Sequence, residues 1–121
     1  MPSAPEIKKL SLDIFDALIK GNFDSPLAKK HLSPNFVSKH ADEPETTTLQ
    51  EFITKWQTAI VPSMKVEVLD SVAEVEGDKG KVWIYSRLSG VPGVQFVDSV
   101  DIMEWSGDVC VSTKDVQRVV V

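Results

Sequence analysis

Residues 94–109, VQFVDSVDIMEWSGDV, contain the pattern that decides the fold. Val94–Trp105 is rich in apolar and β-branched residues, which predicts one long strand. Residues 106–108 form a Ser-Gly-Asp turn, and a last strand is expected from Val109 to about Val120. Because so short a connection joins two long strands, the stretch predicts an antiparallel hairpin.

The residues before this hairpin repeat the same pattern. Turns that contain glycine, at residues 77–80 and 90–93, bound a strand expected over Lys81–Ser89. From Lys65 to Val75, valines largely alternate with polar residues, with an irregularity near residues 70–71. Three short connections between four long segments therefore indicate an antiparallel sheet.

A helix with clear start and stop signals opens the chain. Ser3 and Glu6 form a capping box, in which each side chain satisfies a free backbone N–H group of the first turn. Gly21 ends the helix, because glycine readily takes the left-handed conformation found there. The apolar residues between these signals recur at helical spacing and are Ile7, Leu10, Ile14, Phe15 and Leu18.

Shorter elements follow this helix. Residues 25–32 open with Ser-Pro and predict a helix of less than two turns. A strand is expected over Phe36–Ala41, and a polar loop over Asp42–Thr47. A second capping box begins at Thr48 and opens a third helix, which ends before Pro62.

Helices first and strands afterwards is the layout of an α+β domain. We therefore predict a single domain over residues 1–121, in which three helices pack on one face of a curved antiparallel β-sheet. A helix layer over a curved sheet leaves a cone-shaped cavity between the two layers, where a small ligand would bind.

The composition excludes several classes of protein. Among 121 residues, 18 are acidic and 13 basic, and the net charge of −5 argues against a nucleic-acid partner. The single cysteine, Cys110, cannot form an internal disulfide, which favours a reducing compartment. No segment has the pattern of a membrane span or a secretory signal. The expected location is therefore cytoplasmic.

The sequence contains none of the common cofactor or metal motifs. It has no glycine-rich phosphate loop, no Cys-x-x-Cys and no His-Glu-x-x-His, and its only histidines are His31 and His40. We therefore expect no cofactor and no metal ion. Proton transfer is the chemistry that the remaining side chains support.

Two polar residues are candidate catalytic groups. His40 lies on a strand expected at the mouth of the cavity, and histidine is a natural general base near neutral pH; otherwise it is a surface histidine. Asp101 lies in the middle of a long strand, where burial of an unpaired carboxyl is costly and indicates either an interaction partner or a functional role. The alternative for Asp101 is a solvated side chain or a structural hydrogen bond. His31 is expected to be solvated at the end of its short helix.

Alternation along the strands sorts the residues near Asp101. If Asp101 faces the helices, Ser99 and Met103 share its face. Trp83 and Tyr85 share one face of the preceding strand, and which face is inward depends on the strand pairing. The residues expected to shape the cavity and bind the substrate are Phe15, Trp56, Tyr85, Ser99 and Met103.

Three stretches resemble the NTF2-like superfamily, in particular its SnoaL-like and ketosteroid-isomerase-like members. They are residues 18–24 (LIKGNFD), residues 32–37 (LSPNFV) and residues 100–107 (VDIMEWSG). The resemblance covers nearly the whole chain and implies the NTF2-like fold, a cystatin-like roll. This fold hosts enzymes of several classes as well as non-catalytic binders.

The resemblance also implies roles for single residues. His40 falls where ketosteroid isomerases place the general base, and Asp101 matches the aspartic acid that helps to stabilise the dienolate oxygen. The tyrosine that completes this constellation is replaced by Ile14, which argues against steroid isomerisation itself. SnoaL-like cyclases often pair histidine and aspartate in this cavity, so His40 and Asp101 are compatible with proton transfer on a carbonyl substrate.

Three functions remain open at this point. The first is a cofactor-free isomerase, cyclase or dehydratase, in which His40 moves a proton next to the carbonyl of a small apolar metabolite and Asp101 assists. The second is a non-catalytic ligand-binding or dimerisation domain. The third is a protein-binding adaptor, supported by the apolar residues 119–121 and the aromatic strand faces. The resemblance also implies a homodimer formed through the open face of the sheet.

Overall fold

The computed structural model describes all of residues 1–121 and begins with helix α1, Ala4–Ile19. The Ser3 hydroxyl accepts a hydrogen bond from the N–H of Glu6, whose carboxylate accepts one from the N–H of Ser3. The predicted capping box is therefore confirmed. Gly21, just after the helix, has a φ of 72°, the left-handed conformation that glycine adopts without strain.

Two shorter helices follow, with the first strand between them. Helix α2 spans Pro26–His31, strand β1 spans Leu32–His40, and helix α3 spans Leu49–Ala59. The strand begins directly after α2, earlier than the predicted start at Phe36. Its early part contains Pro34, which the sheet tolerates because β1 is an edge strand.

Four long strands complete the chain: β2 (Lys65–Glu76), β3 (Lys79–Ser89), β4 (Phe96–Ser106) and β5 (Val109–Val120). Each pairs antiparallel with the next, which confirms the three predicted hairpins. The pairing of β2 with β3 shifts register just before Asp70, at the predicted irregularity.

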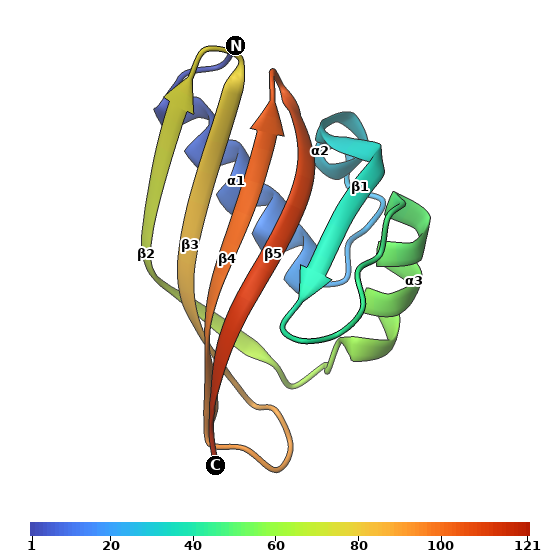
Figure 1. Ribbon diagram of the computed structural model, residues 1–121. Helices are drawn as coiled ribbons and strands as arrows, with labels where there is room; N and C mark the ends of the chain where they lie inside the picture. Colours follow the sequence, from blue (N-terminus) through green and yellow to red (C-terminus); the bar gives the residue numbers. More distant parts are fainter.

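Strand β1 makes the sheet mixed rather than purely antiparallel. It pairs parallel with β5, so the strand order is β1-β5-β4-β3-β2 and only the last four strands are antiparallel. Parallel pairing needs a long crossover, which α3 and the strands β2 to β4 provide. Figure 1 shows the curved sheet, with α1 crossing behind it and α2 and α3 beside β1. The predicted α+β class with a helix-covered sheet is confirmed.

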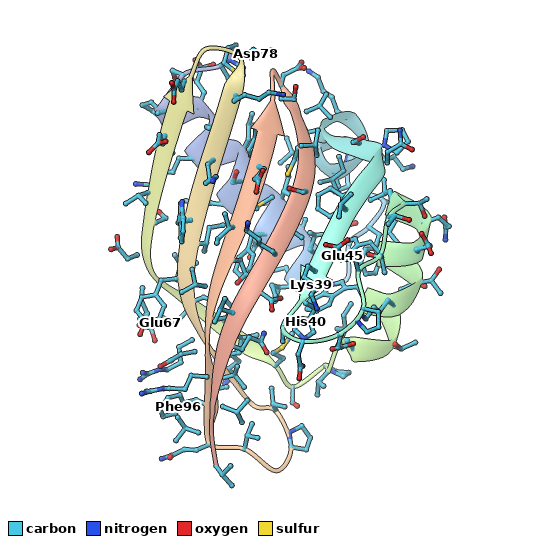
Figure 2. All side chains as sticks on the ribbon, in the orientation of Figure 1. Lys39, His40, Glu45, Glu67, Asp78 and Phe96 are labelled. Carbon is cyan, nitrogen blue, oxygen red and sulfur yellow. The ribbon has the colours of Figure 1, made fainter.

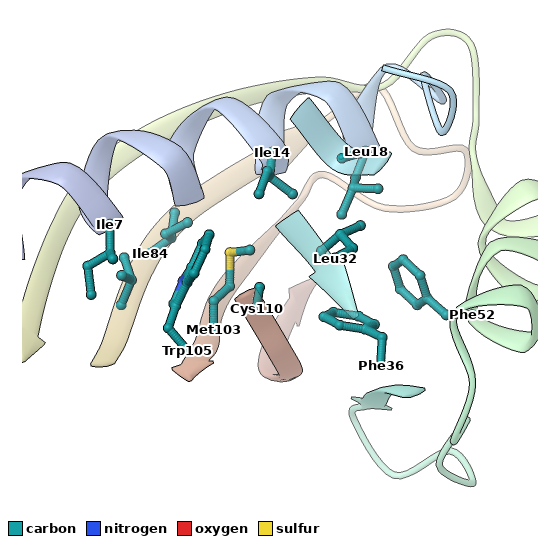
Figure 3. Close-up of a cluster of buried hydrophobic side chains, with 12 residues drawn as sticks. Ile7, Ile14, Leu18, Leu32, Phe36, Phe52, Ile84, Met103, Trp105 and Cys110 are labelled. Carbon is teal, nitrogen blue, oxygen red and sulfur yellow. The ribbon is translucent and has the colours of Figure 1, made fainter. Parts of the chain in front are cut away.

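The core lies between α1 and the inner face of the sheet, as Figure 3 shows. Ile7 and Ile14 are fully buried, and Trp105 donates its ring N–H to the Ser11 hydroxyl at 2.9 Å. A Cβ atom on Gly80 would lie 2.6 Å from Cδ1 of Ile7, so glycine at this position lets α1 approach the sheet closely. None of the three helices has the length and apolar character that a membrane-spanning helix requires.

His31 is buried, and the expectation that it is solvated is wrong. Only 7% of the residue is exposed, and its Nδ1 lies 2.8 Å from the carbonyl oxygen of Asp108. Its ring centroid lies 6.0 Å from that of Trp105. The turn between β4 and β5 therefore packs against the end of α2 and covers this histidine.

Candidate functional site

A cavity of about 180 Å³ lies between the inner face of the sheet and helices α1 and α3. The helices supply much of its apolar wall, including Phe15 and Leu18 from α1 and Phe52 and Trp56 from α3. Apolar walls with a few convergent polar groups are typical of small-molecule sites. The polar side chains that the strands contribute are Ser38, His40, Ser99, Asp101, Thr113, Asp115 and Gln117.

The structure brings all of the predicted site residues except Tyr85 to this cavity. Strands β1 and β4 contribute the candidate catalytic residues His40 and Asp101. The cavity lining also includes the predicted ligand-binding residues Phe15, Trp56, Ser99 and Met103. The pairing of the strands thus decides which face of β4 points into the cavity. That these residues bind a ligand or take part in catalysis stays a prediction.

Tyr85 lies on the outer face of the sheet, so the prediction that it lines the cavity is wrong. Its neighbours along β3, Ile84 and Ser86, are fully buried and point toward the helices. Side chains alternate along a strand, and Tyr85 therefore points outward, with 38% of the residue exposed. Trp83 shares this outer face and is 43% exposed.

Three ionisable side chains lie in a row across β1, β5 and β4. Asp115 of β5 is the direct partner of His40 on one side and of Asp101 on the other. Nδ1 of His40 lies 2.5 Å from Oδ2 of Asp115. The other oxygen of Asp115 accepts a hydrogen bond at 2.8 Å from the N–H of Ala41. Asp115 therefore holds both the side chain and the backbone at the end of β1.

Asp115 orients His40 and favours its charged form. Their hydrogen bond raises the pKa of His40 above its ordinary value, and the negative charges of Asp115 and Glu43 act in the same direction against the effect of burial. With Nδ1 facing Asp115, the ring directs Nε2 toward Glu43, 3.5 Å away. Figure 2 shows His40 at the end of β1, next to Lys39, where the chain enters the loop that carries Glu45.

Asp101 lies deeper in the cavity and has the most strongly shifted carboxyl group. Burial raises its pKa to about 7, against an opposing effect from the Ser99 hydroxyl, which donates to Oδ2 at 2.9 Å. The negative charge of Asp115 raises this pKa further, whereas His40 lowers it. A carboxyl group with such a pKa can take up and release a proton near neutral pH.

An ion pair between two partly exposed side chains lies at the mouth of the cavity. Nζ of Lys55, on α3, lies 3.0 Å from Oε1 of Glu43, in the loop after β1. Lys55 also donates to the carbonyl oxygen of Pro44 at 3.3 Å. Because Glu43 faces His40 with its other oxygen, its carboxylate lies between two cationic side chains.

Sequence reasoning missed Asp115, although a signal was present. Asp115 lies within residues 109–120, where apolar and polar residues alternate as in a strand. Aspartate has a low strand propensity there, as Asp101 has on β4. That the two face each other depends on the register between β4 and β5, which the sequence does not reveal. Lys55 and Glu43 carry no such signal, because their contact depends on the path of a loop. No group of three or more His, Cys, Asp or Glu side chains is arranged to hold a metal ion.

Known proteins resemble the chain along nearly its whole length, although no family model matches it. Two curated relatives carry the name "Probable cyclase otaY". The one from Aspergillus carbonarius is 30% identical over 123 residues, covering 98% of this chain and 94% of the relative. The one from Aspergillus niger is 28% identical over 116 residues, covering 93% of each.

Solved structures share the fold at lower identity. The CaMKII hub of S. rosetta has a TM-score of 0.81 at 14% identity, covering 98% of this chain and all of that chain (100%). A Shewanella frigidimarina protein described as a ketosteroid isomerase has a TM-score of 0.76 at 11% identity, covering 89% and 92%. A Jannaschia protein described as a SnoaL-like polyketide cyclase has a TM-score of 0.67 at 18% identity, covering 97% and 88%.

These structural similarities establish the fold. The sequence similarity to the two curated relatives covers almost the full length of this chain and of each relative. The chain therefore belongs to the same family as the A. carbonarius protein named "Probable cyclase otaY", and it has the fold of the NTF2-like, SnoaL-like and ketosteroid-isomerase-like solved structures.

Proposed function

We propose that this protein is a cofactor-independent enzyme that transfers a proton on a small, mostly apolar carbonyl compound, in a cyclase- or isomerase-type reaction. The observation that carries the proposal is the setting of Asp101, whose carboxyl lines a largely apolar cavity and has a pKa raised to about 7 by burial. General acid–base catalysis is most effective when the pKa of the group lies near the working pH.

Asp101 is the group that moves the proton in this proposal. One of its oxygens accepts the hydrogen bond from Ser99, which leaves the other oxygen for the ligand. The ionised carboxylate takes a proton from the carbon next to the carbonyl group. The resulting carboxylic acid then returns the proton to another atom of the same molecule, so no oxidant or second reactant is needed.

His40 receives a different role from the general base expected from the sequence. Its contact with Asp115 favours the protonated ring, which donates hydrogen bonds but has no free nitrogen to accept a proton. We assign to His40 the binding of negative charge on the ligand, because a charged donor in a partly buried site binds an anionic group strongly. Asp115 is then a positioning residue.

The names of the relatives support a cyclase- or isomerase-type reaction. Both curated relatives are named as cyclases, and two of the structural neighbours are described as a polyketide cyclase and a ketosteroid isomerase. Ile14, which replaces the tyrosine of ketosteroid isomerases, is fully buried in the core. It offers no hydroxyl to a substrate oxygen, and we therefore do not propose steroid isomerisation.

Exchange of carbon-bound protons tests the proposal without knowledge of the natural substrate. The protein is mixed with 2-tetralone, an apolar ketone, in D2O, and the loss of the protons next to the carbonyl is followed by NMR. The Asp101→Asn variant should lose about a hundredfold or more of the catalysed rate. The Glu104→Gln variant, on the same strand but paired with Lys114 outside the cavity, is the matched control. An Asp101→Asn variant as fast as the wild type would refute the proposal.

The outer face of the sheet supports a second candidate function, a dimerisation domain. Tyr85, Val100 and Val116 are direct neighbours across β3, β4 and β5, and Val116 is 68% exposed. Trp83 and Val72 form a second apolar pair on this face. An exposed apolar patch of this kind favours a protein partner, and one structural neighbour is described as a hub. We propose a homodimer through this face, which is compatible with catalysis in each cavity.

A further inference from the structure

We propose that His40 and Lys55 form a carboxylate-binding site at the mouth of the cavity, and that the natural ligand carries a carboxylate group which takes the place of Glu43. The inference rests on the proposed function, because it adds a chemical group to the ligand of the same cavity. It narrows the ligand class to apolar carbonyl compounds that are also carboxylic acids.

The contacts of Glu43 show what the two cationic side chains can bind. Its Oε1 lies 3.0 Å from Nζ of Lys55, and its Oε2 lies 3.5 Å from Nε2 of His40. One carboxylate therefore faces two cationic groups with its two oxygens, and all three residues line the cavity. The chain's own Glu43 thus occupies the position of a ligand carboxylate.

Glu43 is the replaceable member of this group. His40 and Lys55 lie on regular elements, β1 and α3, whereas Glu43 lies in the exposed loop that joins them. The side chain of Glu43 is 47% exposed, and so exposed an ion pair contributes little to stability. A ligand that supplies its own carboxylate and also buries apolar surface can therefore displace it.

The charges at the mouth favour replacement over simple addition. Asp115 and Glu43 already balance His40 and Lys55, so a further anion would be repelled while Glu43 stays in place. When the ligand's carboxylate replaces that of Glu43, the local charge balance is unchanged. Lys55 keeps its bond to the carbonyl oxygen of Pro44 and remains at the mouth.

The wall next to Lys55 suits the apolar body of such a ligand. Trp56, the next residue along α3, lines the cavity and donates its ring N–H to the carbonyl oxygen of Leu18 at 2.7 Å, which fixes the ring in the wall. Phe15 and Met103 add to the apolar lining of the same cavity, which also holds Asp101. A ligand held at the mouth by its carboxylate therefore extends along these residues toward the proton-transfer group.

Binding of two matched probes tests the inference. The probes are 4-phenylbutanoate and its neutral isostere 4-phenylbutanamide, titrated into the full chain while the imidazole signals are followed by NMR. We expect the carboxylate to bind about tenfold more tightly than the amide, the effect of one charge-assisted contact. The signal of His40 should shift on binding, whereas that of the buried His31, which faces Asp108, should not.

Two variants should change carboxylate binding in opposite directions. Glu43→Gln removes the competing charge and should tighten binding of 4-phenylbutanoate severalfold, with no change for the amide. Lys55→Met removes one cation and should abolish the preference for the carboxylate. The matched control is Glu45→Gln, on the same exposed loop, which should leave both affinities unchanged.

The outcomes separate this inference from the proposed function. Equal affinity for the two probes, or weaker carboxylate binding in Glu43→Gln, would overturn the carboxylate site. Neither result affects the exchange test, because 2-tetralone has no carboxylate. If neither probe binds the wild-type protein, the carboxylate site is likewise overturned, and proton exchange on 2-tetralone still decides the proposed function by itself.

Discussion

The Oδ2 atom of Asp115 lies 2.5 Å from Nδ1 of His40, although 75 positions separate the two residues in the sequence. The parallel pairing of β1 with β5 creates this contact, because it sets the end of β1 beside the middle of β5. The same strand, β5, places Asp115 opposite Asp101 on its other side. The state of one carboxylate therefore affects both candidate catalytic groups.

Removal of the Asp115 charge should lower the pKa of His40. In Asp115→Asn the ring loses the hydrogen bond that raises its pKa, so the value should fall toward that of an ordinary histidine. An NMR titration of the His40 imidazole signals measures this. Asp42→Asn, in the adjacent loop, should leave the pKa of His40 in place. An unchanged pKa in Asp115→Asn would contradict the assigned contact.

Asp101 should make the fold less stable as the pH rises from about 4 to 7. Its pKa is 3.8 when unfolded and about 7 when folded, so within this window the folded state binds a proton that the unfolded state has released. The stability is therefore greatest at low pH and falls as the pH approaches 7, by about 4 kcal/mol at most. Asp101→Asn should remove this contribution.

Chemical denaturation at pH 5 and at pH 8 measures the effect. The difference in the free energy of unfolding between the two pH values should be smaller in Asp101→Asn than in the wild type. Glu104→Gln, which lies on the same strand and pairs with Lys114, controls for general charge effects. Identical pH dependence in Asp101→Asn and the wild type would show that the carboxyl is solvated.

The hydrogen bond between Trp105 and Ser11 should stabilise the core. In Ser11→Ala the ring N–H of Trp105 stays buried without an acceptor, which costs about 1–3 kcal/mol. Thermal and chemical unfolding measure the loss. Asp13→Ala, on the exposed side of the same helix, should change the free energy of unfolding by no more than about 0.5 kcal/mol. Equal stability of Ser11→Ala and the wild type would rule out this bond.

The outer face of the sheet should hold two chains together. We expect a solution mass of about twice the 13.4 kDa of one chain at micromolar concentration, measured by light scattering. Trp83→Lys places a charge in the middle of the apolar face and should give a monomer that remains folded. A wild-type protein that is monomeric at this concentration contradicts the homodimer.

Local sequence signals predicted the elements well, because their causes are local. The capping box of Ser3 and the turn at Gly21 depend only on neighbouring residues. The parallel partner of β1 and the inward face of β4 depend on pairing between distant segments, and sequence alternation leaves such pairing open. For this reason Asp101 could be named as a candidate and its neighbour Asp115 was missed, while Tyr85 was assigned to the wrong face.

The most direct test of the central claim is the pH dependence of proton exchange on 2-tetralone in D2O. If Asp101 takes the proton, the catalysed rate should rise with pH through a midpoint near 7, the pKa that burial gives this carboxyl. Asp101→Asn should abolish both the rate and the midpoint, and Glu104→Gln should retain them. A wild-type rate with the same pH profile in Asp101→Asn would contradict the account.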